Sequence, residues 1–192
     1  MSTQPREPRS AYIHVPFCAH RCCYCDFTLV AGRDELIDEY LNALEIDLRR
    51  LEQPRLIETL FLGGGTPTHL NPDQLSRLVE LLRSWFWLTA DCEFSVEANP
   101  VGLCDEKLSL LKDVGVNRIS LGMQSFDDDV LKFLERDHRR KDIEEVIERV
   151  QKKFDNFSLD LIFGVPGQTI DLWESTLETA IGFAPRHIST YG

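Results

Sequence analysis

The chain has 192 residues, of which 43% are hydrophobic and 28% charged, and its formal net charge is -11. A chain of this length and apolar content can bury a core as one domain, and its acidity argues against a nucleic-acid partner. No apolar stretch reaches the roughly 18 residues of a membrane span, and residues 1–10 lack the apolar region of a secretion signal. We therefore expect a cytoplasmic protein with reduced thiols.

The first third of the sequence predicts two strand-helix units. Residues 11–17 alternate as in a strand, and residues 35–52 carry apolar side chains at helical spacing, with a cysteine-rich loop between them. Residues 56–62 predict a second strand that ends in three glycines. The next helix begins with Asn71 as its N-cap and Pro72 at its first position.

The pattern continues to the end of the chain. Further strands are predicted at 92–98, 117–125, 157–165 and 186–192. Helical segments are predicted at 105–115, 127–137, 141–154 and 171–183, with Gly115 as a helix stop. Six strands alternating with helices predict an α/β fold with a parallel sheet and right-handed crossovers.

Two closures of this sheet remain open: a doubly wound sheet and a partial barrel of six strand-helix units. Both place ligands at the carboxyl ends of the strands. We expect residues 1–10 to be an N-terminal tail and residues 11–192 to be one core domain. Because the chain stops at a strand with no helix to cover it, we expect it to be shorter than its relatives.

Four of the six cysteines lie in "CAHRCCYC", directly after the first predicted strand. Cys18, Cys22 and Cys25 follow the spacing C-x-x-x-C-x-x-C, and Cys23 is an additional cysteine. Three thiolates on one loop crowd negative charge, which a metal centre compensates. In a reducing compartment, such a cluster indicates metal binding or catalysis before it indicates disulfides.

Three interpretations of this loop are open. A structural zinc site needs a fourth ligand, which could be Cys23, His14 or His20, but the usual second Cys or His pair is missing downstream. Core or redox thiols without a metal have little packing rationale at this density. The spacing favours a three-cysteine iron-sulfur cluster, whose unligated iron is open to another molecule.

Polar groups follow the ends of several other strands. The "GGGTPT" segment lets a ligand approach the backbone, although a tight strand-to-helix turn would explain it equally well. Glu97, Gln124 and Asp160 end apolar strands, where a buried carboxylate or amide needs a partner. Arg136 could pair with a ligand carboxylate, or it could lie on a helix surface. Together these residues predict one cavity.

Six segments, taken in order, resemble a known family. They are "YIHVPFC", the cysteine motif followed by Asp26 and Phe27, "GGGTPT", "VEANP", "GVNRISLGMQSF" and "DLIFGVPGQT". This series resembles the radical S-adenosylmethionine (SAM) enzymes, specifically the oxygen-independent coproporphyrinogen III oxidases and their haem-chaperone (HemW-type) branch. The resemblance runs from about residue 11 to the last residue, and it implies a partial barrel of the radical SAM type.

The resemblance also implies cofactors and the residues that bind them. Cys18, Cys22 and Cys25 would hold a [4Fe-4S] cluster, whose fourth iron binds the amino and carboxylate groups of SAM. The implied SAM contacts are Tyr12, Tyr24, Gly64, Gly65, Thr66, Glu97, Gln124, Arg136, Asp160 and Gly192. In the oxidases, cleavage of SAM leads to loss of carbon dioxide from a propionate side chain; in the chaperones, haem is bound and passed to an acceptor protein.

Departures from the family pattern favour the chaperone branch. The oxidases have a further cysteine two residues after the motif, where this chain has Phe27. Cys23 stands where the chaperones usually have proline. We expect a haem chaperone-like protein that lacks the C-terminal domain of its relatives; the electron donor is not indicated. The alternatives are a coproporphyrinogen oxidase, hence an oxidoreductase, and a truncated non-catalytic core or a zinc protein.

Overall fold

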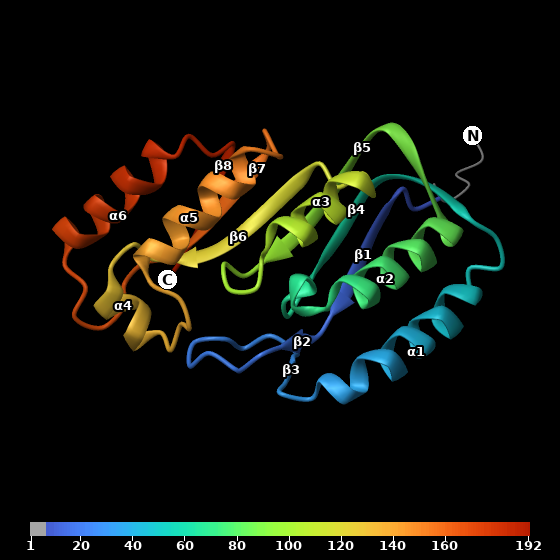
Figure 1. Cartoon of the computed structure of the whole chain (residues 1–192), viewed down its shortest axis with the longest axis horizontal. Helices are drawn as coiled ribbons and strands as arrows, with labels where there is room; N and C mark the ends of the chain where they lie inside the picture. The colour runs from blue at the N-terminus through green and yellow to red at the C-terminus, as the bar shows by residue number, and fades with distance from the viewer. Residues whose placement is uncertain (1–6) are drawn as a thin grey trace, which may run out of the picture.

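Six parallel strands form the central sheet of the computed structural model, which describes residues 7–192 (Figure 1). The strands are β1 (Ser10–Val15), β4 (Arg55–Gly64), β5 (Phe86–Ala98), β6 (Arg118–Gln124), β7 (Phe157–Ile162) and β8 (His187–Tyr191). Their spatial order β1-β4-β5-β6-β7-β8 follows the chain without reversal. A doubly wound sheet reverses its order at a switch point, so this topology agrees with the partial barrel. The α/β prediction is confirmed.

Helices connect consecutive strands, as predicted. They are α1 (Ile37–Arg49), α2 (Pro72–Trp85), α3 (Asp105–Asp113), α4 (Asp128–Phe133), α5 (Arg140–Gln151) and α6 (Ile170–Gly182), with short 3-10 helices η1 (Asp34–Leu36) and η2 (Pro67–His69). Asn71 and Gln74 form the capping box that starts α2. Gly115, with φ of 90°, follows the end of α3. No helix within residues 7–192 is long and apolar enough to cross a membrane.

Two details differ from the predicted strands. The strand predicted at residues 11–17 divides at Pro16, and a small parallel sheet pairs β2 (Phe17–Cys18) with β3 (Val30–Ala31). Strand β5 begins at Phe86, directly after α2, rather than at residue 92. Its added part pairs with the start of β4 but lacks regular alternation, because Leu88 and Thr89 are both half-buried and Ala90 and Asp91 are both exposed. Periodicity alone could not detect it.

The two faces of the sheet have opposite character. On the helix side, alternate residues such as Val15, Leu62, Val96, Leu121 and Leu159 are fully buried in one apolar core. The side chains between them, on the inner face of the partial barrel, are mostly polar or aromatic. Because side chains alternate along a strand, the same six strands build both the core and a polar inner surface. Part of that inner surface, toward the carboxyl ends of the strands, lines a cavity.

Candidate cofactor site

A cavity of about 360 Å³ opens at the carboxyl ends of the strands. The loop between β2 and β3, which carries the cysteines, lies across these ends and reaches α4 (Figure 1). Most of the predicted site residues line the cavity: Cys18, Cys22, Tyr24, Cys25, Gly64, Gly65, Thr66, Glu97, Gln124, Arg136 and Asp160. Segments far apart in the sequence therefore meet where the topology predicted.

The three motif cysteines are free thiols at one end of this cavity. Cys18 Sγ lies 3.4 Å from Thr66 Oγ1, and the Cys25 amide donates to the Cys22 carbonyl at 3.1 Å. Burial raises the pKa of the Cys18 thiol, and the neighbouring Cys25 and Cys22 raise this pKa further. Three thiolates would therefore repel one another unless a positive centre lies between them.

Two of the three other candidate metal ligands, Cys23 and His14, point elsewhere, whereas His20 lines the cavity and its Nε2 lies 3.6 Å from Cys22 Sγ. Cys23 is exposed, donates to the Phe133 carbonyl at 3.4 Å and does not line the cavity. His14 Nε2 lies 2.7 Å from the Thr28 carbonyl oxygen. Among residues 7–192, no three His, Cys, Asp or Glu side chains converge closely enough to hold a single metal ion. A zinc site needs all its ligands on one ion, whereas a [4Fe-4S] cluster spreads its cysteine ligands over separate irons.

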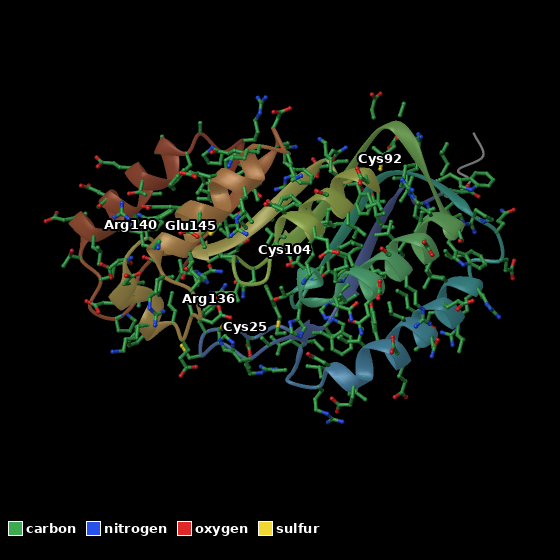
Figure 2. All side chains as sticks on the ribbon, in the orientation of Figure 1. Cys25, Cys92, Cys104, Arg136, Arg140 and Glu145 are labelled. Carbon is green, nitrogen blue, oxygen red and sulfur yellow. The ribbon has the colours of Figure 1, made fainter. Side chains whose placement is uncertain are left out.

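Arg136 joins the cysteine loop to the sheet. Its Nη1 donates to Tyr24 Oη at 3.2 Å and to Cys22 Sγ at 3.4 Å. Its Nη2 donates to Asn99 Oδ1 at 3.1 Å and to the Gly122 carbonyl at 3.0 Å, both at the strand ends. Nε is buried without a partner in the described part of the chain. The helix-surface alternative for Arg136 is therefore wrong; Figure 2 places its side chain at the same end of the sheet as Cys25.

The glycine segment is packed tightly against its own protein. A Cβ on Gly64 would lie 2.5 Å from the His14 ring, and one on Gly65 would lie 2.7 Å from the backbone of Pro16. The Gly64 amide donates to Glu97 Oε2 at 2.9 Å. Glycine is thus required by protein packing here, and the Gly64 amide already has a partner. The amides of Gly65 and Thr66, which also line the cavity, are occupied as well, because they donate to the Val15 and Phe17 carbonyls at 2.8 Å each.

Three carboxylates line the cavity, and two of them, Glu97 and Asp160, belong to the strands of the sheet. Burial raises the pKa of Glu97, the nearby Asp160 adds to this, and the Gly64 amide opposes it. Burial also raises the pKa of Asp160, while Ser189, Ser120 and Arg118 oppose that rise. A bound group that offers N–H or O–H donors would replace the water these carboxylates have lost.

Gln124 ends β6 in a conformation that is uncommon for a residue with a side chain. Its φ is 67°, and the residue is only 8% exposed. Non-glycine residues in the left-handed region cost free energy and occur preferentially at functional sites. The bend turns the backbone at the cavity rim, where the sheet register between β6 and β7 also shifts.

Two predicted contacts lie outside the cavity lining. The Tyr12 ring stacks on Phe61 with centroids 5.9 Å apart, and its hydroxyl lies 3.2 Å from His14 Nδ1. Gly192 packs against the Phe163 ring, which a Cβ would approach to 2.7 Å. The inner face also contributes lining residues that the sequence analysis missed, including Asn99, Ser120 and Tyr191. Asn99 lies within the "VEANP" motif, and Ser120 follows from alternation once the register with Asp160 is known.

The donor set fits an iron-sulfur cluster together with a polar, partly charged molecule. Three thiols gather at one end of the cavity, while carboxylates, an amide and a guanidinium line the rest. The thiols suit soft iron, and the mixed polar groups suit a ligand with both amino and carboxylate functions.

Comparisons with known proteins agree with this donor set. The Radical SAM superfamily matches residues 12–180. The chain is 46% identical over 189 residues to "Heme chaperone HemW" of Bacillus subtilis (strain 168), covering 95% of this chain and 50% of that protein. It is 34% identical over 192 residues to "Oxygen-independent coproporphyrinogen III oxidase" of Salmonella typhimurium, covering 97% of this chain and 42% of that protein.

A solved structure also matches along nearly the whole chain. The structure of coproporphyrinogen III oxidase (HemN) from Escherichia coli, described as a radical SAM enzyme, superimposes with a TM-score of 0.88 at 34% identity. The match covers 98% of this chain and 45% of that one. The chain therefore spans about half the length of the curated relatives it matches.

Proposed function

Because the chain belongs to the radical SAM superfamily, we propose that Cys18, Cys22 and Cys25 bind a [4Fe-4S] cluster and that the adjoining cavity binds SAM. The observation that carries this proposal is the cavity itself, which joins three free thiols to polar groups from the strand ends. When bound, a reduced cluster of this type supplies one electron for cleavage of the carbon-sulfur bond of SAM.

The chain's own residues would bind and orient this cofactor. Glu97 and Asp160 would accept hydrogen bonds from its donors, and Arg136 would offer its unpartnered Nε to an acceptor. Gln124 would present an amide from the bent end of β6. Apolar side chains such as Ile162 and the aromatic ring of Phe27 would exclude water from the same space.

For the whole protein, we infer a haem chaperone-like role, with haem and a haem-acceptor protein as partners. The 46% identity to a haem chaperone supports this role over the oxidase at 34% identity. Phe27 supports it too, because it lines the cavity where the oxidases have a fourth cysteine. Oxygen-independent coproporphyrinogen oxidation is the second candidate, supported by the match to the HemN structure.

Anaerobic reconstitution tests the cluster proposal. The protein should bind about four irons and four sulfides per chain. A colourless protein that holds one zinc ion would contradict the proposal. Matched Cys22→Ala and Cys23→Ala variants provide the control, because the two cysteines are adjacent and only Cys22 lines the cavity.

The two candidate functions differ in one assay. Reduced protein is incubated with SAM and coproporphyrinogen, and separately with haem. Stable haem binding without decarboxylation supports the chaperone role, whereas release of carbon dioxide rejects it in favour of the oxidase.

A further inference from the structure

A chain of hydrogen bonds crosses the inner face of the sheet below the cavity and is buried except at Glu93, whose side chain is 50% exposed. It runs through six side chains on three adjacent strands: Glu93 and Ser95 on β5, Arg118 and Ser120 on β6, and Ser158 and Asp160 on β7. The three serines are almost fully buried, and the Arg118 side chain is only 18% exposed. Of these residues, only Ser120 and Asp160 line the cavity.

One arm of this chain runs from Arg118 to the cavity. Arg118 Nη2 donates to Ser158 Oγ at 3.2 Å, and Ser158 then donates to Ser120 Oγ at 2.9 Å. Ser120 in turn donates to Asp160 Oδ2 at 2.9 Å. A guanidinium can only donate, so each hydroxyl accepts on one side and donates on the other, and every donor points toward Asp160.

The second arm runs away from the cavity. Arg118 Nη1 donates to Ser95 Oγ at 3.3 Å, and Ser95 donates to Glu93 Oε1 at 2.9 Å. Glu93 also lies 3.7 Å from Arg118 Nη1. Glu93 thus holds the guanidinium from the other side and neutralises part of its charge. Both arms begin at Arg118 and end at a carboxylate.

The direction of these hydrogen bonds affects the ionisation of the Asp160 carboxyl group. Burial disfavours its charged form, and the nearby carboxylate of Glu97 lies in the same cavity. The series of hydrogen bonds from Arg118 ends in the Ser120 hydroxyl, which donates to Asp160. A donor at this position favours the ionised form of the Asp160 carboxyl group. An ionised carboxylate has about four acceptor sites, so Asp160 can receive Ser120 and still accept donors from a ligand.

We propose that Arg118 is a positioning residue for the cofactor, acting through Ser158 and Ser120 to hold Asp160 as an oriented, ionised acceptor. Asp160 would accept a hydrogen bond from a hydroxyl or amino group of SAM. This inference rests on the proposed cofactor site, and it adds two residues, Arg118 and Ser158, that do not line the cavity.

The test is a SAM titration of the reduced, reconstituted protein, followed by the electron paramagnetic resonance signal of the cluster. Ser158→Ala interrupts the chain without removing a charge or touching the cavity. We expect it to keep about four irons per chain and to raise the SAM concentration at half-saturation by about tenfold. Arg118→Met should do the same, and Arg118→Lys should recover part of the affinity.

A double variant shows whether Arg118 and Ser158 affect SAM binding through one series of hydrogen bonds or independently. If the serine transmits the influence of the arginine, Arg118→Met added to Ser158→Ala should weaken binding little further. The control is Arg83→Met, since Arg83 is an exposed arginine on α2 that donates to the Val114 carbonyl at 2.9 Å. This control should bind SAM as the unchanged protein does.

Two results would overturn the proposal: unchanged SAM affinity in Ser158→Ala with the cluster intact, or fully additive losses in the double variant. If Arg118→Met does not fold, Ser120→Ala takes its place in the double variant with Ser158→Ala, so that both results can still be measured. Failure of the proposed function looks different, because the unchanged protein would then show no spectral response to SAM at all.

Discussion

The cysteine loop and the strand ends line the same cavity but are held in place differently. Glu97, Gln124 and Asp160 belong to strands whose other face is buried in the main core. The loop between β2 and β3 is irregular and largely exposed, and it is tied down by separate polar contacts with the segment after α4. The sheet side is therefore rigid before a ligand binds, whereas the loop side depends on single side chains and on its cluster.

The largest effect should come from the loop itself. Cys22→Ala should remove the cluster, reducing iron from about four per chain to near zero, because two thiolates cannot replace three. Cys23→Ala should leave the iron content unchanged, since Cys23 contacts the Phe133 carbonyl outside the cavity. Iron and sulfide analysis after anaerobic reconstitution measures both. Loss of the cluster in Cys23→Ala would show that the loop is arranged differently.

On the sheet side, Gly65→Ala should destabilise the fold without any cofactor. The added methyl would lie 2.7 Å from Pro16 backbone atoms and 2.8 Å from the Phe17 carbonyl oxygen. Overpacking of this kind costs about 1 to 3 kcal/mol. Urea denaturation of the apo protein measures the free energy of unfolding.

The matched control for this substitution is Gly182→Ala. Gly182 ends α6, and an added Cβ there meets no atom within 4 Å. The free energy of unfolding of Gly182→Ala should stay within about 1 kcal/mol of the original value. A small increase is expected, because alanine favours a helix more than glycine does. Equal losses in the two variants would contradict the close packing at Gly65.

The buried carboxylates predict a pH dependence of stability. Burial raises the pKa of Glu97 in the folded state, so the folded apo protein binds more protons than the unfolded chain just above the ordinary carboxyl pKa. This group's contribution to the free energy of unfolding should therefore rise as the pH falls through its raised, folded-state pKa, and level off near the unfolded value of about 4.3.

Glu97→Gln isolates this contribution from the other carboxylates. The stability difference between the variant and the original should change across that pH range, in the sense that the original gains on acidification. Denaturation curves at several pH values measure the difference. A difference that is constant with pH would mean that Glu97 has the same pKa in both states.

The smallest effect concerns the contact between the loop and the turn that follows α4. His20 Nε2 lies 2.8 Å from the Glu135 carbonyl oxygen, a typical hydrogen-bond distance, so His20→Ala should loosen the loop. In the apo protein, Cys22 and Cys25 should then react several-fold faster with an alkylating reagent, measured by mass spectrometry. His69→Ala serves as the control, because His69 pairs with Asp34 away from the cysteines. Equal rates in both variants would show that the contact does not restrain the loop.

The same contrast explains what the sequence could predict. Strand and helix positions follow from apolar periodicity, so the order of the fold and the strand-end residues Glu97, Gln124 and Asp160 could be predicted from it. Arg136 could not be placed, because its segment follows a short helix and its direction depends on Cys22 and Asn99 across the cavity.

Small and irregular features carried too little signal. Strands β2 and β3 have two residues each, which no periodic pattern can reveal. The family motif suggests Tyr12 as a cofactor contact, which stays a prediction; its ring stacks on Phe61 and is not part of the cavity lining. The buried chain around Arg118 needs the lateral register of three strands, which a single sequence does not contain.

The most direct test of the central claim is the electron paramagnetic resonance spectrum of the reduced, reconstituted protein before and after SAM is added. We expect about four irons per chain and a spectrum that changes with SAM, because the three thiols that would hold the cluster line the same cavity as the proposed SAM contacts. An intact cluster whose spectrum does not respond to SAM would contradict the proposed site.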